Sequence, residues 1–186
     1  MLSHHPQAQV KLQVELDTFL KSGQPLNSHT VGQLQYLNAC LNETLRISPI
    51  SPFLGRVGTK PLTLSTSGIT IPENVGIGVN VQYMNMSPRY YSNPTRFSPE
   101  RFLGPVTDDV TPNTPTADIS AFFPFSYGKR TCFGRRYGLA MTKLICLKIL
   151  TQFKVEPLGG KFGDIKPMHN PVQKEAYFNV KFSKRV

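Results

Sequence analysis

The chain of 186 residues has the size of one ordinary domain, and its hydrophobic content of 39% is sufficient for a core. Its 21 Lys and Arg against 11 Asp and Glu give a formal net charge of +10. This charge suits an acidic protein partner, a membrane surface or nucleic acid. The basic residues are dispersed and no nucleic-acid-binding motif accompanies them, so we expect no nucleic-acid partner. No apolar run approaches the roughly 20 residues of a membrane span, and no signal peptide opens the chain.

The chain contains three cysteines, Cys40, Cys132 and Cys146. Their spacing is not that of a zinc knuckle, and their odd number indicates free thiols in a reducing compartment. We therefore expect an intracellular protein without a structural zinc site. Only Cys132 lies in a sequence setting typical of a metal ligand.

Two helices are predicted in the first quarter of the chain. Apolar residues at helical spacing follow Pro6, which suits a first turn, and a second apolar series predicts a helix over about residues 34–46. Several N-cap candidates stand at residues 27–30. Glu43 and Arg46 share one face of the second helix and can pair. The alternative is an ordinary surface ion pair.

Short β-type runs broken by Gly and Pro extend over residues 53–83, with strands expected at 62–64, 69–71 and 75–81. Prolines in residues 93–103 exclude a long helix and predict an extended segment.

Later segments are also predictable from pattern. Residues 107–116 are typical of a loop, residues 135–153 of a helix and residues 177–182 of a strand.

The stretch FSYGKRTCFG at residues 125–134 is the most informative. A thiolate ligand requires a loop that directs backbone N–H groups at sulfur, and the positive end of a following helix dipole favours the anion. Gly128 and Gly134 allow the backbone to bend and to approach a flat ligand, and Arg130 can pair with a carboxylate at its edge. The pattern predicts a cysteine-ligated haem. A buried free cysteine before a helix is the alternative.

Phe125, Gly128, Arg130, Cys132 and Gly134 together resemble the haem-binding loop Phe-x-x-Gly-x-Arg-x-Cys-x-Gly of the cytochrome P-450 monooxygenases. The Glu-x-x-Arg helix and the Pro-Glu-Arg-Phe segment at residues 99–102 are similar to two further family motifs, in the family's order. The resemblance covers nearly the whole chain. It implies an α+β, mainly helical fold, the C-terminal portion of the cytochrome P-450 fold.

The resemblance also implies a role for three arginines. Arg101 would complete a buried Glu–Arg–Arg cluster with Glu43 and Arg46, a structural unit that holds the shell around the loop. Arg56 falls where the family has an arginine that reaches a haem propionate, with a solvated strand arginine as the alternative.

The implied cofactor is haem b, with the Cys132 thiolate as axial ligand, Phe125 shielding the sulfur and Arg130 holding a propionate. The implied reaction inserts one oxygen atom from O2 into a small apolar organic substrate, with electrons from a reductase or a ferredoxin. Basic residues around the loop offer a docking face for an acidic donor, or else a solvated helix face.

Residues 1–186 are expected to form a single partial domain, because the chain is much shorter than a complete family member. By the resemblance it begins about where the family's long central helix ends, so no catalytic residue is assigned. The alternatives are a truncated, catalytically inactive haem-binding remnant, an unfolded fragment, or a basic interaction module without haem. Association with the endoplasmic reticulum or mitochondrial membrane is expected only for a complete eukaryotic member.

Overall fold

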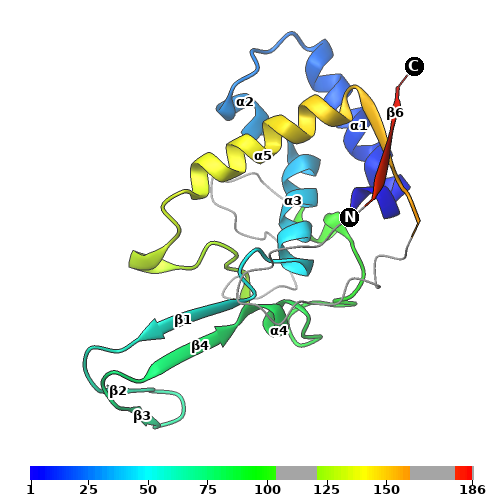
Figure 1. Ribbon diagram of the computed structural model, residues 1–186. Helices are drawn as coiled ribbons and strands as arrows, with labels where there is room; N and C mark the ends of the chain where they lie inside the picture. The colour runs from blue at the N-terminus through cyan, green and yellow to red at the C-terminus, as the bar shows by residue number, and fades with distance from the viewer. Residues whose placement is uncertain (104–120, 160–178, 186) are drawn as a thin grey trace.

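The computed structural model describes residues 1–103, 121–159 and 179–185. Its helices and 3-10 turns are η1 (Leu2–His4), α1 (Pro6–Lys21), α2 (Ser28–Gly32), α3 (Gln35–Ile47), α4 (Val81–Asn85), η2 (Pro99–Phe102), η4 (Gly128–Arg130) and α5 (Arg135–Leu150). Its strands are β1 (Phe53–Val57), β2 (Leu62–Thr63), β3 (Thr70–Ile71), β4 (Gly76–Asn80), β5 (Phe153–Pro157) and β6 (Val180–Lys184). They form antiparallel pairs β1–β4, β2–β3 and β5–β6. The helices α1, α3 and α5 gather together, and β1 to β4 (residues 53–80, the β arm) project away from them (Figure 1).

The main core lies between α1, α3 and α5, where Leu12 and Leu16 of α1 are fully buried. Buried amides join α1 to the end of α5 and to β5. Gln13 Nε2 donates to the carbonyls of Leu150 at 3.3 Å and Phe153 at 3.2 Å. The Leu150 carbonyl belongs to the last turn of α5, so the glutamine satisfies a group that the helix leaves without an internal partner.

The start of α3 differs from the sequence prediction. The cap candidates at residues 27–30 begin a separate helix, α2, where Asn27 Oδ1 accepts from the N–H groups of His29 and Thr30 at 3.0 Å. The helix α3 is capped instead by Glu15 of α1, whose carboxylate accepts from Tyr36 N at 2.7 Å and Leu37 N at 2.9 Å. A carboxylate there also suits the positive end of the helix dipole.

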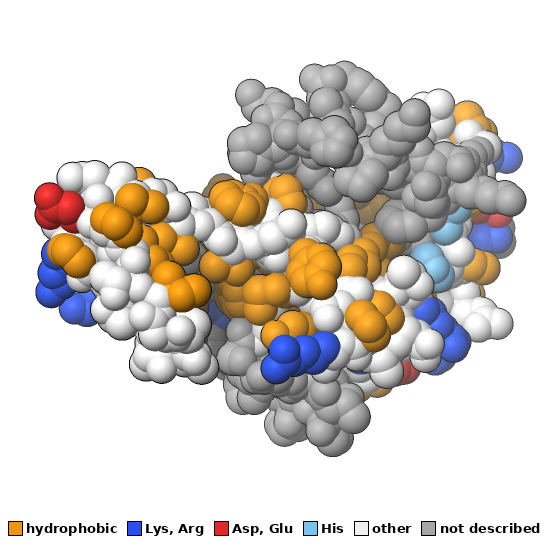
Figure 2. All heavy atoms as spheres, turned by 90° about the horizontal axis from the view of Figure 1, so that it is seen from below, with side chains coloured by type: hydrophobic (Ala, Val, Ile, Leu, Met, Phe, Trp, Pro, Cys, Tyr) orange, Lys and Arg blue, Asp and Glu red, His pale blue; other side chains and the backbone are white. Residues whose placement is uncertain are grey.

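The β arm contains the expected strands in shorter form. The predicted strand at residues 75–81 ends at Asn80, because the Asn80 side chain accepts from Tyr83 N at 2.9 Å and begins α4. The main partner of β4 is β1, in a register that places Arg56 opposite Ile77. Apolar side chains lie exposed along the arm and across the adjoining middle of the same face (Figure 2).

The helix predicted at residues 135–153 ends at Leu150, since β5 begins at Phe153 and pairs with β6. The predicted loop at 107–116 and residues 177–178 of the predicted terminal strand lie outside the described residues. Among the residues described, no helix has both the length and the apolar character needed to cross a bilayer.

Candidate functional site

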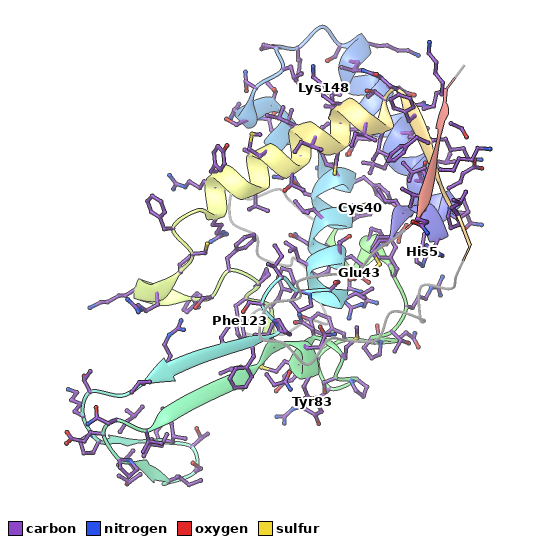
Figure 3. All side chains as sticks on the ribbon, in the orientation of Figure 1. His5, Cys40, Glu43, Tyr83, Phe123 and Lys148 are labelled. Carbon is purple, nitrogen blue, oxygen red and sulfur yellow. The ribbon has the colours of Figure 1, made fainter. Side chains whose placement is uncertain are left out.

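A buried ionic cluster lies at the C-terminal half of α3, where Figure 3 labels Glu43. The side chains of Glu43 and Arg46 are both 0% exposed, and Arg46 Nε and Nη2 donate to Glu43 Oε2 at 2.7 Å and Oε1 at 2.9 Å. Arg101, from η2, donates from Nε to Glu43 Oε1 at 3.0 Å. This burial rules out the ordinary surface pair that the sequence alone left open.

Backbone groups satisfy the remaining atoms of the cluster. Ser98 N donates to Glu43 Oε1 at 2.8 Å, and Arg46 Nη1 donates to the Asn85 carbonyl at 2.7 Å. Arg101 Nη1 donates to the Ser92 carbonyl at 3.1 Å. Buried charges are tolerated where such bonds complete their coordination. The cluster therefore ties α3 to α4 and to residues 92–101. The sequence predicted an extended segment there, but the structure forms turns and the 3-10 helix η2 instead.

An apolar cluster connects this ionic cluster to the cysteine loop (residues 125–134). Phe102 of η2 and Phe122 pack with ring centroids 4.9 Å apart. Phe125 and Leu139 of α5 pack against the same group. The buried members are Ala39, Leu45, Tyr91, Phe102 and Phe122. The first residue of the loop is thus anchored on the α3 side of the molecule.

The backbone of the cysteine loop closes on itself. Cys132 N donates to the Phe125 carbonyl at 2.8 Å, and Thr131 N donates to the Gly128 carbonyl at 3.0 Å. Gly128 has a φ of +70°, a left-handed conformation that favours glycine. Gly134 is the N-cap of α5 with a φ of −80°, so the turn itself does not require glycine there. Apart from its own chain neighbours, a Cβ at either position would meet no atom of the described residues within 4 Å, so open space borders the loop at both glycines.

The Cys132 thiol is exposed, and exposed aromatic side chains stand on both sides of it in the sequence. Tyr127 is 88% exposed and Phe133 is fully exposed. The first turn of α5 begins at Arg135 and contains no acidic residue. The positive end of the α5 dipole and the neighbouring Arg130 and Arg135 make this surface electropositive.

The other two cysteines lack this setting. Cys40 is buried in the core between α1, α3 and α5 (labelled in Figure 3), and Cys146 packs against that core. Burial raises the pKa of both thiols above the ordinary value, which disfavours the thiolate that a metal requires. In the described part of the chain no three His, Cys, Asp or Glu side chains cluster as a metal site. Cys132 is therefore the cysteine suited to be a ligand.

Two remaining arginines of the expected site lie at the surface. Arg130 is exposed in η4. Arg56 Nη2 donates to Ser126 Oγ at 2.7 Å, which places the arginine against the cysteine loop. The sequence contained no signal for this contact, because the two residues are 70 positions apart.

The family model for cytochrome P450 matches residues 1–182, and the chain belongs to the cytochrome P450 family. It is 35% identical over 156 residues to human cytochrome P450 3A7, covering 84% of this chain and 29% of that protein. It is 36% identical over 151 residues to cytochrome P450 3A27 of Oncorhynchus mykiss, covering 81% of this chain and 27% of the relative. The chain thus spans less than a third of the length of the curated relatives it matches, and its α+β structure is a portion of the family fold.

Membership implies haem held through a cysteine thiolate. The residues around Cys132 fit such a group. An exposed thiol in an electropositive loop offers one soft ligand, and Tyr127 and Phe133 offer apolar surface that water solvates poorly. The open space at Gly128 and Gly134 leaves room for a flat molecule beside the loop.

Proposed function

We propose that residues 1–186 form a single partial domain that supplies the thiolate-ligand side of a haem site, in which Cys132 would be the ligand of the iron. The observation that carries this proposal is the contrast among the cysteines. Cys132 is exposed in a loop closed by its own bond to Phe125, whereas Cys40 and Cys146 pack in the core.

Each residue of the loop has a separate task in this proposal. Cys132 would offer its thiolate to the iron, Arg130 would pair with a carboxylate of the cofactor, and Phe125 would keep water from the sulfur. Gly128 supplies the left-handed turn, and Gly134 leaves the surface beside the loop open. When bound, the haem supplies oxygen binding and one-electron chemistry that side chains lack.

Residues farther from the thiol hold this arrangement. Arg56 is available for a second carboxylate of the cofactor, next to its bond with Ser126. Glu43, Arg46 and Arg101 act structurally, since they join α3 to the segment whose Phe102 packs beneath the loop.

As part of a longer protein, this site would belong to a monooxygenase. One oxygen atom of O2 enters a C–H bond of a small apolar organic substrate, and two electrons and two protons convert the other atom to water. A reductase or ferredoxin supplies the electrons. The exposed Lys129 and Arg136 beside Cys132 support docking of an acidic donor on this face. The alternative is a catalytically inactive haem-binding remnant.

The test joins residues 1–186 to the preceding part of human cytochrome P450 3A7, in place of the matching segment of that relative. We expect a thiolate-type Soret band in the reduced carbon monoxide difference spectrum. Cys132→Ser should abolish it, because a serine hydroxyl stays protonated and is a hard ligand. The matched control Cys146→Ser should retain it.

A thiolate-type band that survives Cys132→Ser would refute the ligand assignment. Product formation with a substrate panel would then separate the two candidate functions. A thiolate-type band with no product favours the remnant, and coupled product formation favours the monooxygenase.

A further inference from the structure

One hydrogen bond joins the β arm to the cysteine loop. Arg56 Nη2 donates to Ser126 Oγ at 2.7 Å, and Arg56 Nη1 donates to the Gly55 carbonyl at 2.7 Å. Both terminal nitrogens of the guanidinium are therefore engaged, so its planar fork has a defined orientation. The loop lies between β1 and α5 (Figure 1). Arg56 thus contacts the loop directly, and this contact requires no bound cofactor.

Ser126 has a backbone conformation that requires support. Its φ of +65° is left-handed, which is unfavourable for a residue with a side chain. Ser126 N donates to the Phe123 carbonyl at 2.9 Å on one side. The Arg56 bond holds the side chain on the other. Figure 3 labels Phe123 in the region between α3 and β1.

The next contact leads directly to the cysteine. Phe125 precedes Ser126, and its carbonyl accepts from Cys132 N at 2.8 Å. The peptide unit between Phe125 and Ser126 is planar, so a rotation of the Ser126 backbone moves the Phe125 carbonyl with it. The orientation of this carbonyl determines whether the Cys132 amide keeps its bond.

We propose that Arg56 and Ser126 are positioning residues for Cys132. Their hydrogen bond holds Ser126 in the left-handed conformation and so keeps the Phe125 carbonyl in place for the Cys132 amide. The inference rests on the proposed function, because that proposal makes Cys132 the ligand. It adds a contact within the protein to the expected role of Arg56 toward a cofactor carboxylate.

The two roles of Arg56 make different predictions. A role confined to the cofactor carboxylate acts only when haem is bound, and it does not involve the Ser126 hydroxyl. A positioning role acts in the haem-free chain, and it requires both side chains.

The first measurement is hydrogen exchange at the Cys132 amide of the haem-free 186-residue chain. We expect Ser126→Ala and Arg56→Gln each to lower protection roughly 2- to 10-fold, the range that corresponds to one ordinary hydrogen bond. The double variant should lose no more protection than either single variant, because the two substitutions remove the same hydrogen bond. Ser126→Asn should retain more protection than Ser126→Ala, since asparagine tolerates a left-handed φ and supplies an acceptor.

Two controls separate the loop from the whole fold. Lys60→Gln removes a positive charge from the same arm and should leave the Cys132 amide unchanged. The amides of α3 should keep their protection in every variant. Additive losses in the double variant, or losses spread equally over α3, would overturn the proposal.

The second measurement uses the haem-loaded longer protein described above. Ser126→Ala should increase the share of the reduced carbon monoxide complex that lacks the thiolate-type band, and Ser126→Asn should restore it. If Arg56→Gln increases the share that lacks this band and Ser126→Ala does not, Arg56 acts only on the cofactor carboxylate and the positioning role is refuted. The two proposals can also fail separately. If the variants lose hydrogen-exchange protection at the Cys132 amide but the unsubstituted longer protein shows no thiolate-type band, the positioning role of Arg56 and Ser126 stands and the proposed function is rejected.

Discussion

Glu43 offers the sharpest test of the buried cluster, because one carboxylate holds two guanidinium groups. Glu43→Ala removes the bonds from Arg46 at 2.7 and 2.9 Å, from Arg101 at 3.0 Å and from Ser98 N at 2.8 Å. Arg46 then stays in a site where its side chain is 0% exposed. An unpaired buried charge of this kind costs about 3–5 kcal/mol.

Arg101→Ala should cost less. The Arg101 side chain is 12% exposed, and Arg46 keeps its pairing with Glu43 in this variant. Loss of its charge-assisted bond to Glu43 predicts about 1.5–3 kcal/mol. The other bonds of Arg101, to the carbonyls of Ser92, Asn93 and Arg96, are exposed, and water can replace them. Since Glu43→Ala already removes the Glu43–Arg101 bond, the double variant should cost less than the sum of the two single variants.

Urea unfolding of the 186-residue chain measures these free energies, and haem content of the longer protein measures their effect on the site. Glu156→Ala is the matched control, because Glu156 pairs with Lys154 at 2.8 Å while 53% of the lysine and 38% of the glutamate side chain are exposed. We expect it to leave both readouts unchanged. A small loss for Glu43→Ala that adds to the loss for Arg101→Ala would refute the reasoning, because independent surface residues behave in that way.

Two further predictions concern pH and the chain by itself. Burial raises the pKa of Glu15 above its ordinary value of 4.5, so the folded state binds the proton more tightly and the free energy of unfolding should fall as pH rises from 4.5 through the raised pKa. Glu15→Gln should remove this part of the pH dependence, and identical pH profiles of the urea midpoint would contradict the assignment. The 186-residue chain supplied with haem and a reductase should bind haem weakly and form no hydroxylated product, because the exposed Cys132 and the fully exposed Phe133 leave the site open to water. Coupled, substrate-dependent product formation would contradict this expectation.

Much of the candidate site could be predicted from the sequence because it depends on local spacing. Glu43 and Arg46 are one helical turn apart, so any helix there places them on one face. The left-handed turn at Gly128 is likewise a local property, since glycine adopts positive φ at little cost. The motif around Cys132 and the start of α5 lie within one continuous segment.

Only the tertiary structure decided which of these groups are buried and which segments meet. The Glu43–Arg46 pair has the same sequence spacing whether it lies at the surface or at 0% exposure. The Glu15 cap on α3 and the Arg56–Ser126 bond join residues 21 and 70 positions apart. No local pattern encodes such contacts, because each depends on how whole helices and strands pack against one another.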